Sequence, residues 1–220
     1  MAESGSHTDV SLKTYPARCS LCDALQQAPV ACADCHDLLE HVQGADYFEL
    51  FGLARAYDLV DAELNAKYLA ISRNIHPDRF TANDDTMQRF ALRASAQVNK
   101  AYATLRDPFL RAEYLLESSG GKSASQDKRV PPALLGEVML LREELEEARA
   151  RGDDAAVAAM AADVKARRDA TQVEIARLCG VLAGGGGDGI RDDLRMQLNA
   201  MKYYANLMTE IAAPRAAARP

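Results

Sequence analysis

The sequence predicts an all-α protein in which a helical hairpin is joined to a C-terminal three-helix bundle, with a small tetracysteine zinc knuckle at the N-terminus. Three observations carry this prediction. Apolar residues recur at helical spacing over most of the 220 residues, and no segment alternates apolar and polar residues over a convincing length. A small, polar segment closed by two prolines divides the helical part in two. Four of the five cysteines lie close together near the N-terminus.

The four N-terminal cysteines form two pairs, each with two residues between its members, and nine residues separate the pairs. In a reducing compartment such pairs are typical of thiolate ligands of one tetrahedral Zn²⁺ rather than of disulfides. A redox dithiol and cysteines without a shared role are the alternatives. His36 directly follows the second pair, but four thiols already complete the coordination shell. The predicted zinc ligands are Cys19, Cys22, Cys32 and Cys35.

The composition limits the classes of function. Apolar residues make up 48% of the chain and charged residues 26%, with a formal net charge of −6 at pH 7. This acidic balance argues against binding to duplex nucleic acid, which normally requires a basic surplus. No apolar run approaches the roughly 18 residues that span a bilayer, and the first residues lack the apolar core of a secretory signal. We therefore expect a cytoplasmic protein, with the mitochondrial matrix as the alternative, and neither a nucleic-acid nor a membrane partner.

Two helices are predicted at the start of the helical part. The aromatic and leucine positions of residues 47–53 predict a short helix that Gly52 weakens near its end. Residues 61–75 repeat apolar side chains at helical spacing, with Asp61 as the expected N-cap. This second helix should stop at the His-Pro-Asp tripeptide at 76–78, because proline does not continue a helix.

A long amphipathic helix is predicted after the polar loop at 81–85, and its apolar stripe ends at Leu105. Asp107 and Pro108 then have the pattern of an N-cap followed by proline at the first helical position. A fourth helix should therefore begin there and continue through Leu116.

The second helical part follows residues 120–131, which have the composition of a linker. Three helices are predicted beyond it, over 132–149, 153–178 and 190–212, and a glycine-rich turn separates the last two. Amphipathic helices with short connections form an antiparallel bundle. The predicted domains are therefore a cysteine extension at 1–44, a helical domain at 45–119, the linker at 120–131 and the bundle at 132–220.

The His-Pro-Asp tripeptide has three interpretations. A catalytic histidine needs a nucleophile or a metal within reach, and no serine, cysteine or acidic cluster is evident near it in the sequence, which argues against a hydrolase. The tripeptide could simply end a helix, with the imidazole facing the negative end of the helix dipole. It could also be a surface that another protein recognises. The flanking segments decide between these interpretations.

The flanking segments resemble those of the J domain: a short aromatic helix, a helix with basic residues, the tripeptide, and a long helix that ends in VNKAYATLRDP. The segments DYFELFGLARAYDLVDAELNAKYLAISRNIHPDRF, VNKAYATLRDPFLRAEYLL and LLREELEEA together resemble the HscB family, the J-domain co-chaperones of iron–sulfur cluster assembly. The likeness extends from residue 46 to about residue 212. The tetracysteine segment resembles the zinc-binding extension of some family members. The resemblance implies that the domain at 45–119 is a J domain.

The resemblance implies a first functional surface, which would bind a chaperone of the DnaK/HscA type. The tripeptide matches the J-domain motif position for position, and Arg79 stands where the family more often has lysine. The turn would offer a donor and an acceptor to the chaperone's nucleotide-binding domain and stimulate its ATPase, so this chain itself would not be an enzyme. Basic residues nearby would steer the encounter with an acidic surface. The chaperone-binding residues so predicted are His76, Pro77, Asp78, Arg79, Lys67 and Arg73.

A second surface is predicted on the helix that begins near residue 132. Leucines and a valine recur there at core spacing, and a neighbouring stripe combines apolar with charged residues. By spacing alone, the apolar members of this stripe would widen the core. The resemblance to HscB implies instead that they bind the iron–sulfur scaffold protein IscU, together with an aromatic residue of the last helix. The scaffold-binding residues so predicted are Leu135, Met139, Arg142, Glu143 and Tyr203.

Two positions of this stripe depart from the family. Gly136 replaces an apolar residue, and Leu140 stands where an acid is common, so the patch should be smaller in its middle. The resemblance implies a co-chaperone that delivers an IscU-type scaffold to its chaperone. The alternative is a general J-domain co-chaperone for protein folding, although the sequence lacks the Gly/Phe-rich segment and the CxxCxGxG repeats of such proteins. The sequence leaves self-association open.

Overall fold

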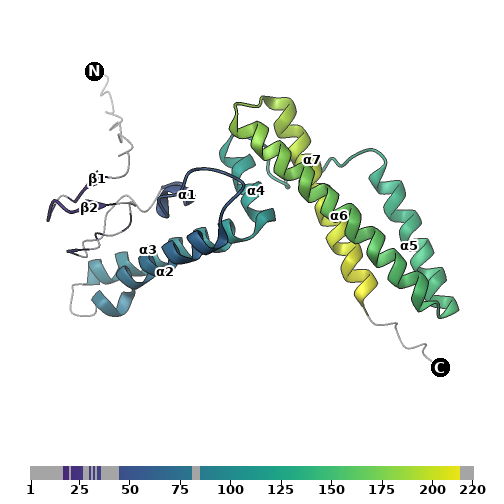
Figure 1. The fold of residues 1–220 in the computed structure, drawn as a ribbon, viewed down its shortest axis with the longest axis horizontal. Coiled ribbons are helices and arrows are strands. Elements are labelled where there is room, and N and C mark those ends of the chain that lie inside the picture. The colour runs from purple at the N-terminus through teal and green to yellow at the C-terminus, as the bar shows by residue number, and fades with distance from the viewer. Residues whose placement is uncertain are drawn as a thin grey trace, which may run out of the picture. The chain divides into compact units, whose positions relative to one another are not determined.

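The computed structural model describes residues 17–19, 21–26, 30, 32, 34–35, 45–80 and 85–213. These residues are almost entirely helical, which confirms the predicted fold class (Figure 1). The chain divides into two compact units. The first unit comprises Met1–Arg55 and Val60–Arg106, and the second unit comprises Ala56–Leu59 and Asp107–Pro220. His36, residues 81–84 of the predicted loop and residues 214–220 of the predicted bundle domain lie outside the described residues.

A small hairpin begins the described part of the first unit. Strands β1 (Ala17–Arg18) and β2 (Leu25–Gln26) pair in antiparallel fashion. The N–H of Cys19 donates to the carbonyl of Ala24 at 2.8 Å, and Asp23 adopts a positive φ of 61° in the turn between the strands. Strands of two residues are too short to show an alternating pattern, so the sequence could not reveal them.

Helix α1 (Tyr47–Leu50) begins with a reciprocal cap. The Asp46 side chain accepts from the N–H of Phe48 at 2.8 Å, and the Glu49 side chain accepts from the N–H of Asp46 at 3.2 Å. This capping box satisfies donors that the first turn of a helix leaves without partners. The helix ends two residues before Gly52, which adopts a positive φ of 58°.

Helix α2 (Asp61–Asn74) has Val60 rather than the predicted Asp61 as its N-cap, and no side chain caps it. Asp61 is instead the first helical residue, where a carboxylate is stabilised by the positive end of the helix dipole. The helix stops before the tripeptide, as predicted. The short 3₁₀ helix η2 (Pro77–Phe80) follows, so the tripeptide occupies a tight helical turn rather than an open loop.

Helix α3 (Asp85–Arg106) packs against both α2 and η2. The predicted amphipathic stripe is confirmed, because its inward residues are fully buried while α2 buries only Leu64 along its length. The core of the first unit also includes buried residues of α1 and the last residue of η2, Phe80. Its buried apolar residues include Phe48, Leu50, Phe51, Leu64, Ile75, Phe80, Ala91, Ala94, Val98, Ala101 and Leu105.

Helix α4 (Pro108–Ser118) begins as predicted, with proline at its first position. The Asp107 carboxylate accepts from the N–H groups of Phe109 and Leu110, at 2.8 Å and 3.1 Å. The helix packs against α6 and α7 of the second unit. The compact units therefore divide before α4, whereas the predicted domain at 45–119 included it.

The segment Ala56–Leu59 also belongs to the second unit, although it lies between α1 and α2 in the chain. The buried guanidinium of Arg111 in α4 donates to the carbonyl of Tyr57 at 2.6 Å and lies 5.7 Å from the centre of its ring. Gln172 of α6 donates to the Tyr57 hydroxyl. Burial raises the pKa of Tyr57 to about 12. These contacts anchor the segment to the second unit.

Residues 120–131, predicted as a linker from their composition, are fixed to α7 by side-chain contacts. The amide of Asn199 donates to the carbonyls of Asp127 and Arg129 at 2.9 Å and 2.8 Å. The buried Asp127 carboxylate accepts from Arg129, which also pairs with Asp192 of α7 at 3.1 Å. Lys122 lies 3.8 Å from Asp192 as well. Composition therefore identified a connection between helices but could not show that it is held in place.

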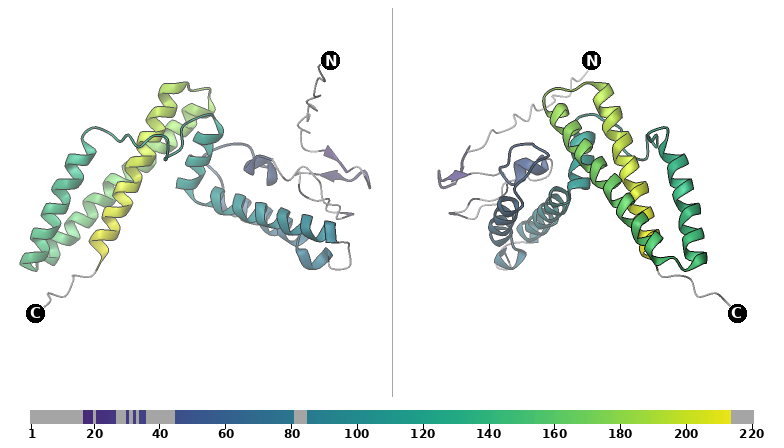
Figure 2. Two further views of the ribbon diagram at one scale, coloured as in Figure 1. Left: turned by 180° about the vertical axis from the view of Figure 1, so that it is seen from behind. Right: turned by 45° about the vertical axis from the view of Figure 1, so that its right-hand side comes forward.

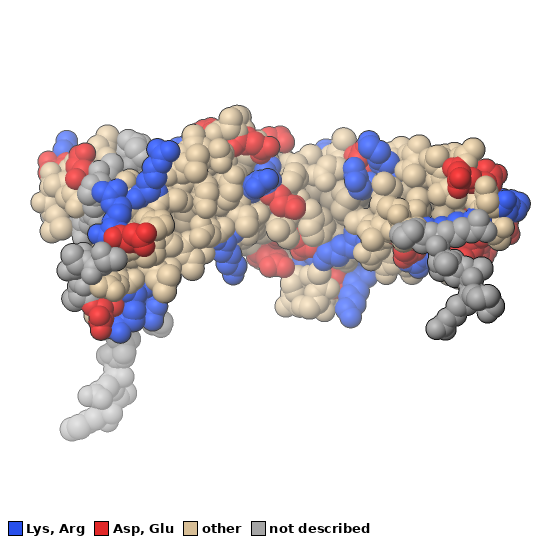
Figure 3. Space-filling model, turned by 90° about the horizontal axis from the view of Figure 1, so that it is seen from below, with Lys and Arg blue, Asp and Glu red and all other residues tan. Residues whose placement is uncertain are grey.

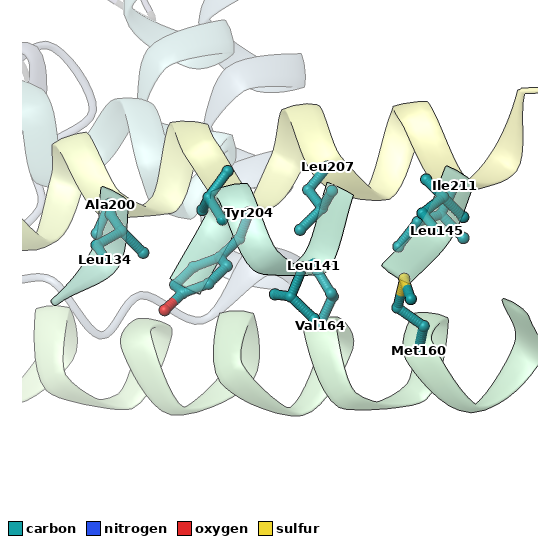
Figure 4. Packing of buried hydrophobic residues seen from close by; sticks show 10 residues of the cluster. Leu134, Leu141, Leu145, Met160, Val164, Ala200, Tyr204, Leu207 and Ile211 are labelled. Atoms are coloured by element: carbon teal, nitrogen blue, oxygen red, sulfur yellow. The ribbon is translucent and has the colours of Figure 1, made fainter. Parts of the chain in front are cut away.

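The three-helix bundle consists of α5 (Leu134–Arg151), α6 (Asp154–Ala183) and α7 (Asp188–Ala212). The helices run side by side in alternating directions (Figures 1 and 2), as predicted. Gly152 ends α5 at a positive φ of 68°, the left-handed conformation that favours glycine. Figure 4 shows side chains of all three helices pointing toward one another. This core contains Leu134, Val138, Leu141, Leu145, Met160, Val164, Ala200, Tyr204, Leu207 and Ile211.

Charges of both signs are interspersed over the face shown in Figure 3, and neither sign gathers into one large patch there. Several oppositely charged side chains form ion pairs between successive turns of one helix, such as Lys165 with Asp169 at 2.7 Å. None of the helices in the described part of the chain is long and apolar enough to cross a membrane.

Candidate functional site

The His-Pro-Asp turn lies directly after α2 and is held by hydrogen bonds within itself. The Arg79 N–H donates to the His76 carbonyl at 3.0 Å, and the Asp78 N–H donates to His76 Nδ1 at 3.3 Å. Nδ1 therefore faces the backbone of the turn, and Nε2 is the ring nitrogen that can meet a partner. The Asp78 carboxylate also lies close, 3.5 Å from the same Nδ1. The side chains of His76 and Asp78 are 59% and 85% exposed, so both are accessible to a partner.

The three basic residues predicted around this turn do not form one cluster. The Arg79 guanidinium donates to the Arg73 carbonyl at 3.3 Å, so these two residues are linked. Lys67 instead donates to the Gly52 carbonyl at 3.3 Å, at the end of α1, and lies 3.7 Å from Glu63. Lys67 and Arg73 are six positions apart in the sequence, which places them about 120° apart around a helix with 3.6 residues per turn. Arg73 and Arg79 therefore lie together at the turn, whereas Lys67 lies on a different face of α2.

The predicted stripe on α5 is solvent-exposed. Leu135 and Met139 are 49% and 63% exposed, whereas the adjacent Leu134 and Val138 are each 2% exposed. The interpretation that Leu135 and Met139 widen the core is therefore wrong. Large apolar side chains gain by leaving water, so a pair of them on one helix face favours contact with a partner. Leu140 is also exposed, 60%, and lies about 100° around the helix from Met139.

Charged residues extend this stripe toward α7. Arg142 forms a two-pronged ion pair with Glu210 of α7, with N···O distances of 2.8 Å and 2.6 Å. This contact raises the pKa of Arg142 and lowers that of Glu210. Tyr203 of α7 is half-buried and packs against the bundle core. Glu143 is exposed and follows Met139 by one helical turn. Arg142 of the predicted stripe thus contacts α7, the helix that carries the predicted aromatic residue.

Glu210 was missed in the sequence reasoning. It follows Tyr203 by seven residues, which is two helical turns, so the two residues lie on the same face of α7. That spacing was the signal that could have found it. Its partner Arg142 is 68 residues away in the chain, and only the packing of α5 against α7 reveals their pairing.

The four N-terminal cysteines come together as predicted. Their sulfur atoms all lie within 4.8 Å of one another, and two pairs of them are 3.5 Å apart. Burial tends to raise the pKa of the Cys32 thiol, but the N–H groups of Cys35 and Asp34 outweigh this effect and lower it to about 6. Metals bind the thiolate form of cysteine, so a lowered pKa favours a role for Cys32 as a metal ligand. The cluster could therefore hold a metal ion.

Comparison with known proteins identifies the family. The chain is 37% identical over 153 residues to a "Co-chaperone protein HscB homolog" of Ralstonia nicotianae, a match that covers 69% of this chain and 85% of that protein. The chain belongs to the HscB co-chaperone family. A family model described as "HSCB C-terminal oligomerisation domain" matches residues 130–212, which include α5, α6 and α7. Membership of a co-chaperone family fits a role other than that of an enzyme.

Solved HscB structures share this fold. The structure of the chaperone HscB from Vibrio cholerae is 34% identical, covers 76% of this chain and 95% of its own, and superimposes with a TM-score of 0.62. The human co-chaperone protein HscB is 25% identical, covers 89% of this chain and 96% of its own, and gives a TM-score of 0.69. The resemblance identified from the sequence is thereby confirmed.

Proposed function

We propose that this chain binds an IscU-type iron–sulfur scaffold protein and delivers it to a DnaK/HscA-type chaperone, stimulating the ATPase of that chaperone during cluster transfer. The observation that carries the proposal is the exposed, internally bonded His-Pro-Asp turn at the end of α2 in a chain of the HscB family. The residues that act on the two partners lie in different compact units, so each activity can be removed separately.

The first unit acts on the chaperone. The His76 imidazole presents Nε2 as a donor, and the Asp78 carboxylate presents acceptors, from a turn whose backbone Pro77 restricts. Arg79 and Arg73 add positive charge beside the turn. These cations favour association with an acidic surface and raise the rate of encounter. ATP hydrolysis takes place on the chaperone.

The second unit binds the scaffold. Leu135 and Met139 supply apolar anchors, and Tyr203 of α7 supplies an aromatic side chain on the same bundle. Glu210 holds the Arg142 guanidinium, which leaves its remaining N–H groups as donors in a fixed orientation. A small apolar centre with a charged border is the arrangement that concentrates binding energy in a few residues. Glu143 extends this border on the same helix face.

The cysteine cluster holds Zn²⁺ in this proposal. A Zn–S distance of about 2.3 Å in a tetrahedron gives S···S distances of about 3.8 Å. The observed sulfur separations, 3.5 Å for two pairs and at most 4.8 Å for the others, surround this value. Four thiolates leave no open coordination position, so the ion would stabilise the N-terminal segment rather than take part in catalysis.

The test measures phosphate release by a purified HscA-type chaperone, with this chain and an IscU-type scaffold added singly and together. His76→Gln should fold normally but lose the stimulation, because the exposed imidazole contributes little to the core. Leu135→Ala with Met139→Ala should retain stimulation by the chain alone and lose the additional effect of the scaffold. Full stimulation by His76→Gln would refute the chaperone assignment. Equal stimulation by unfolded client proteins in place of the scaffold would favour a general folding co-chaperone.

A further inference from the structure

The proline of the His-Pro-Asp turn leaves the end of α2 with carbonyl groups that need partners. The Arg73 carbonyl would normally accept from the N–H four residues later, but that residue is Pro77, which has none. The Arg79 guanidinium takes its place, at 3.3 Å. The Ile75 carbonyl would in turn accept from the Arg79 N–H, but in the 3₁₀ turn this N–H donates to the His76 carbonyl at 3.0 Å. The Ile75 carbonyl therefore needs a donor from elsewhere.

Ser95 of α3 supplies that donor. Its hydroxyl donates to the Ile75 carbonyl at 3.2 Å, across the interface between the two helices. Ile75 is 1% exposed and is joined directly to His76, so this hydrogen bond fixes the backbone at the point where the turn begins. An unpaired carbonyl in such a site would be costly, because little water reaches it.

Two further contacts continue along the same side of α3. The Tyr68 hydroxyl donates to the Asn99 side chain, and the Tyr102 hydroxyl donates to the Asn65 side chain, both at 3.0 Å. The two tyrosine rings stack, with centroids 4.0 Å apart and planes 11° from parallel. Ser95, Asn99 and Tyr102 are four and three residues apart, so they form one stripe. Leu64 is the buried residue of α2, and these polar contacts and the ring stack add to the attachment of α2 to α3.

We infer that Ser95 is a positioning residue for the His-Pro-Asp turn: its hydroxyl holds the Ile75 carbonyl and thereby sets the direction in which His76 and Asp78 face a chaperone. This inference rests on the proposed function for its consequence in ATPase stimulation. The hydrogen bond itself can be tested without a chaperone. The contacts of Tyr68 and Tyr102 lie between about 1.7 and 2.5 turns from the end of α2 and stabilise the pairing of the helices rather than the turn.

The experiment measures amide hydrogen exchange by NMR in the full chain and phosphate release by an HscA-type chaperone. In Ser95→Ala the Ile75 and Arg79 amides should exchange at least about fivefold faster, which is the effect of losing one ordinary hydrogen bond. The Val98 amide in the buried part of α3 should be unchanged. The maximal stimulation should fall about two- to fivefold for the same reason. Ser95→Thr keeps the hydroxyl, so its amide exchange and its stimulation of the chaperone should equal those of the wild type. In Tyr102→Phe, the Ile75 and Arg79 amides should exchange at the wild-type rate.

Three results would overturn the inference. The first is exchange at Ile75 and Arg79 in Ser95→Ala equal to that of the wild type. The second is equal acceleration at Val98, which would show a general loss of stability. The third is Ser95→Thr behaving as Ser95→Ala, which would assign the effect to side-chain shape rather than to the hydroxyl. If the wild type does not stimulate the chaperone, the proposed function fails, and the exchange rates still decide whether Ser95 holds the turn.

Discussion

Replacing the exposed pair on α5 tests the scaffold surface against its buried neighbours. The surface variant is Leu135→Ala with Met139→Ala. The matched control is Leu134→Ala with Leu141→Ala, which removes two apolar side chains from the other side of the same helix. Leu134 is 2% and Leu141 9% exposed, compared with 49% and 63% for Leu135 and Met139. The two variants therefore change similar chemistry in opposite environments.

The magnitudes follow from this burial. Full burial of a leucine or methionine side chain is worth about 1.5–3 kcal/mol, and roughly half of that area or less is covered in the surface pair, so truncating both should cost about 1–2 kcal/mol of stability. Each buried leucine should cost about 2–5 kcal/mol, because a cavity remains in the packed core. For binding, loss of two anchors should cost about 2 kcal/mol or more, which is over tenfold in affinity.

Calorimetric titration with an IscU-type scaffold and thermal unfolding of the same samples separate the two effects. The surface variant should lose affinity with a stability loss of only about 1–2 kcal/mol, and the control should lose several times as much stability. A surface variant that binds the scaffold with unchanged affinity would refute the reasoning. So would a surface variant that unfolds as readily as the control, since it would show that the two side chains belong to the core.

Three further predictions concern the metal, the acid response and the fifth cysteine. The purified chain should carry one zinc per molecule, and chelation should release it while the helical circular dichroism is retained; loss of all helical signal would contradict this. Contacts with Arg129 hold the pKa of Asp127 well below its usual value, so they stabilise the fold above the unfolded-state pKa of about 4 and the stabilisation is lost as the pH falls below it. In Asp127→Asn the midpoint temperature of unfolding should therefore fall less steeply than in the wild type as the pH is lowered from about 4 to about 2. Burial raises the pKa of Cys179 to about 12, so iodoacetamide at pH 8 should leave this thiol unmodified until the protein is unfolded, as read by mass spectrometry.

Local patterns in the sequence were sufficient for the helices and for the cysteine cluster. The stripe formed by Leu134, Val138, Leu141 and Leu145 is buried as its spacing predicted. The cap formed by Asp107 and Pro108 depends on residues within a single turn. The cysteine pairs came together as their spacing indicated. The likeness to HscB also depended on contiguous segments, which is why one sequence revealed it.

The tertiary structure decided which distant groups meet. Composition could not show that α4 joins the second unit or that Asn199 fixes residues 120–131, because both depend on helices far away in the chain. Spacing could not separate the exposed Leu135 and Met139 from the core, since a wider apolar stripe has the same pattern. The contact from Ser95 to Ile75 spans 20 residues and requires α2 and α3 to lie in one register. The sequence determined each helix through interactions within a turn or two, whereas the pairing of polar groups between helices required their positions in space.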